Sequence, residues 1–356
     1  MDNIMRYQES LSVFFLAALG MIPAYSHHAA SAAFDVTEYI EIEGYVDEFI
    51  FKNPHVNVVL TVTDDDGVEG SWMATAPSTA AMRRWGWTAD TFQEGQYLRV
   101  VGHPRRDAGP MVLLERRAFT AGSDAVAEID PADGSVIRNL ASTDRLQRRT
   151  ADSLNPTLDD GRPNLTGTWF GGDPGSTDRP PAPWNEAGRT MQAAFDAAAD
   201  PAFTDCEAPG LVRTVTTIHS VEIEQHDDRV VVAFEGGGDG RVIYLDGRGS
   251  DTDEHTRLGH AVARYENGAL VIETTQLASR LSSISGHLLS DQATTVETYR
   301  RADDPVLGPR LEMSIVVTDP VYLDGPWEMG WQKPHAAEEY EFTGVDCRLP
   351  LRASSN

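Results

Sequence analysis

Three histidines near the start of the chain have the type and spacing to hold a metal ion. His27 and His28 are adjacent, and His55 lies in a segment that alternates apolar and polar residues. If a leader ends at Ser26, the mature chain begins with the free amine of His27. An amine and imidazoles are nitrogen ligands that copper and zinc accept. We therefore predict a copper or zinc site at His27, His28 and His55; the alternative is an exposed terminal pair without a role.

A second group lies on a hairpin in the C-terminal half. Asn267-Gly268 is a strong two-residue turn signal, and it sets the register of the strands on either side. Counting outward from the turn places His260, Arg264 and Glu273 on one face of the sheet. If this face lines a pocket, Glu273 between His260 and Arg264 is suited to acid–base chemistry. The alternative is that the face is solvated.

His287 is a further catalytic candidate. It follows Ser285-Gly286 in a loop between two predicted strands, from which a side chain can cover the mouth of a barrel. The alternative is an ordinary exposed loop histidine. The sequence has no Gly-x-Ser-x-Gly elbow, Walker loop, dinucleotide fingerprint or Cys-x-x-Cys pair. Serine-hydrolase, nucleotide, nicotinamide and haem-c functions are therefore disfavoured.

The segment that precedes these candidates has the pattern of a secretory leader. Arg6 comes before an apolar run at residues 11–22, and Ala24 and Ser26 are the small residues that a signal peptidase needs. We predict a signal peptide at residues 1–26 and a periplasmic or secreted protein. The apolar run is shorter than the ~20 residues that span a bilayer, so we expect no stable membrane span after cleavage. An uncleaved anchor is the alternative.

The pattern of strands and one helix around the first histidines predicts a small β-barrel at residues 27–121. Five strands and one short helix are expected, in the order strand, strand, strand, helix, strand, strand. Their predicted ranges are 39–51, 55–63, 71–76, 78–84 for the helix, 96–103 and 111–117. This is the order of an OB-type barrel. Residues 122–161 are polar, acidic and rich in turn-forming residues, and we interpret them as a linker.

Residues 162–356 are predicted to form a second barrel. A strand through Trp169 is followed by an alanine-rich helix at about 185–199 and then by about eight short strands with hairpin spacing. This pattern favours an antiparallel, lipocalin-like barrel with one helix. The fold class is therefore mainly β, with an OB-like barrel first and the larger barrel second.

Several motifs resemble those of known but uncharacterised exported bacterial domains. In the first region they are His27-His28-Ala29, Asn53-Pro54-His55, Gly86-Trp87 and Gly102-His103-Pro104. In the second region they are Tyr244-Leu245-Asp246-Gly247-Arg248, Gly259-His260, Glu273-Thr274-Thr275, Asp319-Pro320 and Pro326-Trp327. The first set resembles a domain family of unknown function with His-His and Asn-Pro-His motifs, and the second is similar to another uncharacterised exported β-rich domain. The resemblance implies fold and location, but it implies no activity. Ala29 departs from the serine typical of the first family.

Charge and cysteine content limit the partners. The formal net charge is −26, which repels nucleic-acid phosphates, so nucleic acid is not expected as a partner. Cys206 and Cys347 are the two cysteines, and in an oxidising compartment we expect them to form a disulfide.

Together these patterns predict a periplasmic ligand-binding or accessory protein. We expect an N-terminal metal site and a barrel cavity for a small, partly apolar molecule. The alternative is a lyase, isomerase or hydratase that uses the acid–base residues of the second barrel. A structural role beside a protein partner is a third reading.

Overall fold

The computed structural model describes most of the chain between residues 33 and 346. The described ranges are 33–64, 66–84, 87–120, 125–129, 136–139, 155–171, 180–196, 200–217, 219–236, 240–281, 286–304, 308–336, 340, 342–343 and 345–346. The predicted signal peptide, His27, His28, Ser285 and Cys347 lie outside these residues. The leader and the disulfide therefore stay predictions.

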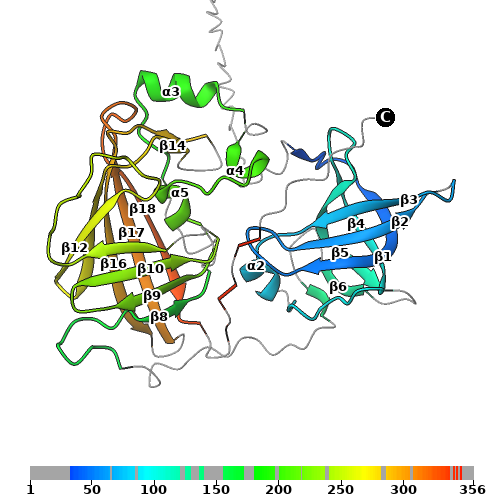
Figure 1. Ribbon diagram of the computed structural model, residues 1–356, viewed down its shortest axis with the longest axis horizontal. Coiled ribbons are helices and arrows are strands. Elements are labelled where there is room, and N and C mark those ends of the chain that lie inside the picture. The colour runs from blue at the N-terminus through cyan, green and yellow to red at the C-terminus, as the bar shows by residue number, and fades with distance from the viewer. Residues whose placement is uncertain are drawn as a thin grey trace, which may run out of the picture.

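The first region folds as the predicted OB-type barrel. Its elements are β1 (Ile40–Ile50), β2 (Asn57–Thr63), β3 (Glu69–Thr75), α2 (Thr79–Arg84), β4 (Tyr97–Pro104) and β5 (Met111–Thr120). The strand order is β3-β2-β1-β4-β5, and a parallel pairing of β3 with β5 closes the barrel. Figure 1 shows this barrel in blue and cyan, with α2 on the side that faces the second barrel.

Residue alternation in β1 explains how this barrel forms. Ile42 and Val46 are buried, whereas Glu41 and Glu43 are exposed, as expected for a strand with one face in the core. Gly44 also points inward, where an added Cβ would lie 2.2 Å from the carbonyl oxygen of Thr61. A side chain at position 44 is therefore incompatible with the close approach of β1 and β2.

Part of the predicted linker belongs to the first sheet. Strands β6 (Ala125–Ile129) and β7 (Val136–Asn139) extend it beyond β5 by antiparallel pairing. Both are short runs rich in β-branched residues or alanine. Five or fewer residues give too little alternation to be recognised as strands from sequence.

The second region is a nearly closed barrel of nine strands. They are β8 (Gly167–Trp169), β9 (Val221–Gln225), β10 (Arg229–Phe234), β11 (Arg241–Tyr244), β12 (His260–Glu266), β13 (Ala269–Thr275), β16 (Thr294–Asp304), β17 (Gly308–Thr318) and β18 (Trp327–Pro334). The order is β18-β17-β16-β13-β12-β11-β10-β9-β8. Bridging of Trp169 to His335 brings the two edges together. Trp169 is fully buried and its indole N–H donates to the Leu165 carbonyl, so it plugs this side of the core.

The barrel differs from the all-antiparallel prediction at one pair of strands. β11 and β12 run parallel, whereas the other neighbouring strands are antiparallel. Residues 245–259 connect the two strands, and a connection of this length can return the chain to the same end of the sheet. A tight hairpin turn would have reversed its direction.

The second region also contains more helix than the single one predicted. α3 (Glu186–Ala193) begins at Asn185, whose side chain accepts a hydrogen bond from the Gly188 N–H. Two further helices follow, α4 (Pro201–Thr204) and α5 (Leu211–Val215). α5 buries Leu211, Val212 and Val215 in the barrel core, so it acts as a plug at one end. Beside it lies a small ribbon of β14 (Arg280–Leu281) and β15 (Leu288–Leu289).

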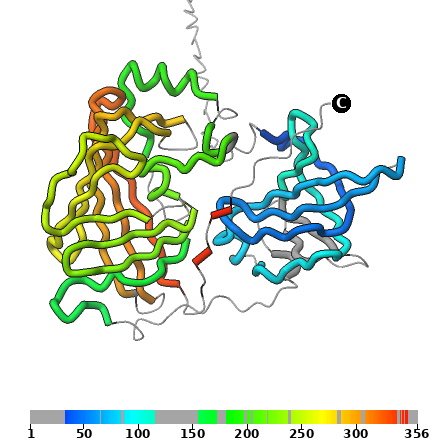
Figure 2. The backbone as a smooth tube through the Cα atoms, viewed as in Figure 1, coloured from blue at the N-terminus to red at the C-terminus, as the bar shows by residue number. Residues whose placement is uncertain are grey.

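The end of the chain contacts the first barrel again. Figure 2 shows red segments beyond β18 in the space between the two barrels. Val345 forms a parallel bridge with Asn53, and the Asp346 N–H donates to the Asn53 carbonyl at 2.8 Å. An apolar cluster also joins the barrels: Ala80 of α2 packs with Phe170, Ala336 and Tyr340.

Candidate functional site

The predicted acid–base residues lie on the outside of the second barrel. The predicted register is confirmed: Tyr265 pairs with Leu270 and His260 with Thr275. However, the side chains of Arg264 and Glu273 are 55% and 49% exposed, and they form an ion pair with each other. Of the two arrangements left open by the sequence, the structure shows the solvated one. Glu273 therefore lies outside the lumen, because the inward positions of these strands are taken by Ala261, Ala263 and Ile272.

His260 and His287 do not form one site with Glu273. The His260 ring stacks on Tyr244 with centroids 5.7 Å apart, and its Nε2 lies 3.0 Å from the Arg248 carbonyl oxygen. His287 instead packs edge to face on Trp184 and Trp327, with centroids 5.0 and 5.1 Å away. Burial lowers the pKa of His287, which keeps its ring neutral among these indoles.

We expect Glu273→Gln to have little effect on folding. The ion pair with Arg264 is about half exposed, and such pairs contribute no more than about 1 kcal/mol. Urea denaturation should place the variant within this margin of the wild type. A larger loss would show that the Glu273 carboxylate makes a stabilising interaction beyond its ion pair with Arg264.

The barrel interior contains a buried ion pair that the sequence analysis missed. Arg241 donates through Nη1 to both carboxylate oxygens of Glu297, at 2.7 and 3.1 Å, and the two side chains are 2% and 0% exposed. The Tyr299 hydroxyl donates to Glu297 at 2.8 Å, and Arg241 also contacts the Thr274 hydroxyl. Burial, followed by the charge of Glu297, raises the pKa of Tyr299 well above its usual value. These side chains fill the lumen together with the apolar core.

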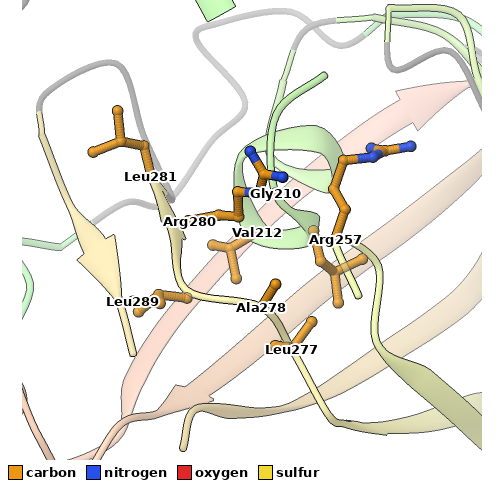
Figure 3. Close-up of a pocket in the computed structure, with 9 residues that line it drawn as sticks. Gly210, Val212, Arg257, Leu277, Ala278, Arg280, Leu281 and Leu289 are labelled. Carbon is orange, nitrogen blue, oxygen red and sulfur yellow. The ribbon is translucent and has the colours of Figure 1, made fainter. Parts of the chain in front are cut away.

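Two adjoining small cavities lie where α5 meets the β14–β15 ribbon. Their volumes are about 10 and 50 Å³, and both are lined by Gly210, Arg280 and Leu281. Figure 3 shows the smaller one, with Leu277, Ala278 and Leu289 below Arg280, and with Arg257 on the opposite side. Cavities for drug-sized ligands are typically several hundred Å³. These have room only for a small group.

His55 lies beside the second barrel with its ring held in a defined position. Its Nδ1 is 3.2 Å from the Ala76 carbonyl oxygen. In the tautomer that this contact favours, Nδ1 has the proton and Nε2 has the lone pair. Desolvation lowers the pKa of His55, although the residue keeps an exposed surface. The imidazole is therefore neutral near pH 7, which is the form that binds metals.

A buried polar network joins the two barrels close to His55. We call it the Glu235 network, and it consists of Glu235, Thr79, Ser220, Tyr340 and Thr343. One Glu235 oxygen accepts from the Thr343 N–H at 3.1 Å, from the Thr343 hydroxyl and from the Thr79 hydroxyl at 3.5 Å. The other accepts from the Tyr340 hydroxyl at 2.6 Å, and Tyr340 in turn contacts Ser220 at 2.7 Å. Thr79 belongs to the first barrel, so the network ties the barrels and the chain end together.

His219 lies next to this network. The His219 ring packs directly against Gly236, the residue that follows Glu235. A Cβ added at Gly236 would lie within 2.5 Å of three atoms of this ring. Its Nδ1 is buried and has no hydrogen-bond partner among the residues that the structure describes. Burial lowers the pKa of His219 to about 4; Glu235 opposes the shift, while Lys333 and His55 add to it. The fully buried Lys333 amine donates to the carbonyls of Thr217 and His219.

The predicted metal ligands are thus only partly located. His55 is described, and His27 and His28 lie outside the described residues. Within the described part of the chain, no group of three or more His, Cys, Asp or Glu side chains is arranged to hold a metal ion. The same part of the chain contains no helix long and apolar enough to cross a bilayer.

Fold and site together define a two-barrel protein with a histidine-bearing border between an OB-type barrel and a nine-stranded one. Residues 16–112 match the model of a family described as a family of unknown function, DUF6152. This agrees with the resemblance of the first region to an uncharacterised domain. No curated protein and no solved structure matches the chain.

Proposed function

We propose that the protein is an exported accessory protein that binds a copper or zinc ion at the border between its two barrels. The observation that supports this is His55: a neutral imidazole, fixed through Nδ1 and exposed on the protein surface. In metal-binding histidines a backbone carbonyl commonly holds one ring nitrogen, as the Ala76 carbonyl holds Nδ1 of His55.

His219 is the second proposed ligand, because it lies at the same border. Thr79 connects the neighbourhoods of the two histidines. Its hydroxyl contacts Asn53, which lies two residues before His55. The same hydroxyl contacts Glu235, which precedes Gly236, the residue against which His219 packs. A charge on His55 also lowers the pKa of His219, as expected for neighbours. Two fixed neutral imidazoles favour copper or zinc over calcium or magnesium, which prefer oxygen ligands.

The N-terminal histidines would complete the ligand set. His27 and His28 precede the first described residue, Ala33, by only a few positions, and export would give His27 a free amine. The Glu235 carboxylate is not assigned as a ligand, because its oxygens already accept four hydrogen bonds.

Metal titration of the exported, untagged protein tests this proposal. We expect binding of one zinc or copper ion per chain, and His55→Ala or His219→Ala should weaken it at least about tenfold. His226→Ala is the matched control, since His226 is 39% exposed on the hairpin between β9 and β10 and should leave affinity unchanged. A chain that begins at residue 29 reports separately on His27 and His28.

Equal metal affinity in the wild type and in His55→Ala would overturn the proposal. Circular dichroism of each variant shows that a lost signal does not come from unfolding. The alternative of a lyase, isomerase or hydratase at His260 and Glu273 has no comparable support, because that face is solvated.

A further inference from the structure

Lys333 is a lysine with no exposed surface. It occupies an inward position of β18, in the same row as Met329 and Trp331, and its exposed fraction is 0%. Lysine is almost never fully buried, because an ammonium group loses its hydration when it leaves water. The loss is compensated only where acceptors are fixed around the amine. Lys333 is therefore bound to a defined set of acceptors.

Two of these acceptors belong to the segment that carries His219. The Lys333 amine donates to the Thr217 carbonyl at 3.2 Å and to the His219 carbonyl at 2.6 Å. Both residues lie in the connection between α5 and β9. The next residue, Ser220, accepts through its carbonyl from the Glu235 N–H at 3.0 Å. The main chain at His219 is thus held on both sides.

The ring of His219 is held separately, by close packing against Gly236. A Cβ at position 236 would lie 2.2 Å from the Cδ2 atom of the ring, so a side chain there would displace it. Lys333 therefore fixes where the residue lies, and Gly236 limits where its ring can point. A metal ligand that is held in advance binds more tightly, because less conformational freedom is lost when the metal arrives.

We propose that Lys333 is a positioning residue of the metal site: its amine aligns the main chain of His219, so that the ring meets the metal ion together with His55. This inference rests on the metal site proposed above and adds the group that aligns one of its ligands. Lys333 does not contact the metal itself. It acts through the carbonyl of His219, as outer groups do around many metal ligands.

The charge of the amine makes this role separable from a purely electrostatic one. A positive charge close to His219 repels a metal cation. Removing the charge alone should therefore strengthen metal binding, whereas losing the alignment of His219 should weaken it. The two effects have opposite signs, so the direction of the change identifies the one that dominates.

Zinc titration of the full-length mature protein with Lys333→Met tests the proposal. Methionine keeps a chain of similar length but has no donor and no charge, and affinity should fall at least about tenfold. Lys52→Met is the matched control. Lys52 is the other lysine of the chain and is exposed three residues before His55, so its loss should not weaken binding.

Cobalt(II), which accepts the same imidazole ligands, gives a spectroscopic measurement of the site. Its visible absorption should change in Lys333→Met and stay the same in Lys52→Met. A residue that only stabilises the fold would lower the unfolding temperature without altering this spectrum. Gly236→Ala displaces the His219 ring with no change of charge, and it should weaken zinc binding as well.

Equal or tighter zinc binding in Lys333→Met, or an unchanged cobalt spectrum, would overturn the role of Lys333. Lys333→Gln retains an N–H donor and replaces the methionine variant if that chain does not fold; a loss of affinity is again expected. If neither variant folds, the amine serves the barrel rather than the site, and the proposal is also overturned. Failure of the metal site itself gives a different result, namely equal affinity in the wild type and in His55→Ala.

Discussion

Replacing Glu297 by alanine is expected to destabilise the protein by about 3–5 kcal/mol. The change removes the carboxylate but leaves the Arg241 guanidinium inside the barrel, where its side chain is 2% exposed. An unpaired buried charge loses its hydration and gains no compensating attraction. The Tyr299 hydroxyl also loses its acceptor. Urea or guanidinium denaturation followed by tryptophan fluorescence measures the effect.

Two controls separate the buried charge from the loss of a side chain. Glu273→Ala removes the same group from the neighbouring strand β13, where it is 49% exposed, and should cost no more than about 1 kcal/mol. The double variant Arg241→Met, Glu297→Leu replaces the pair with apolar groups of similar size, and it should be much more stable than Glu297→Ala alone. If Glu297→Ala and Glu273→Ala had equal effects, the lumen would be hydrated rather than dry.

The same ion pair explains why the sequence did not reveal the lumen. In β16, Val296 is 42% exposed while Glu297 is fully buried, and in β11 Val242 is 43% exposed while Arg241 is buried. The apolar and polar positions are thus opposite to those of an ordinary amphipathic strand. Alternation still predicted strands here, but it could not say which face is inside. That information depends on Arg241 and Glu297 meeting from strands far apart in the sequence.

Sequence motifs of a few residues predicted the structure correctly where the segment's own residues determine its conformation. Asn267 and Gly268 both have positive φ angles, as the predicted hairpin turn requires, and the register on both sides followed from them. Ser78 likewise precedes α2, and its carbonyl accepts the Met82 N–H. The five residues of α5 are too few to show helical periodicity. Its burial depends on the barrel end that surrounds it.

The site at the barrel border illustrates the same limit. His55 was identified because it stands in the Asn53-Pro54-His55 motif, but His219 and Glu235 have no such local signal. Glu235 directly follows β10, and its partners Thr79 and Tyr340 are more than a hundred residues away in either direction. A sequence read in windows of a few residues cannot bring these groups together.

Glu235→Ala is the second substitution with a large expected effect. It should cost about 3 kcal/mol or more, because a buried carboxylate that accepts four hydrogen bonds is removed and its donors are left inside the border. Burial, followed by the charge of Glu235, raises the pKa of Tyr340 well above its ordinary value. The phenol is therefore a permanent donor near neutral pH, and it cannot adapt to the loss of its acceptor by ionising.

The form of the unfolding transition is as informative as its midpoint. Because the Glu235 network connects Thr79 of the first barrel with the second barrel, its loss should uncouple the two barrels. Calorimetry of the wild type should show one cooperative transition, and Glu235→Ala should separate it into two. Glu224→Ala, which removes a glutamate that is 63% exposed on β9, should leave a single transition. A single transition in both variants would mean that the apolar contacts of Ala80, Phe170 and Tyr340 are enough to hold the barrels together.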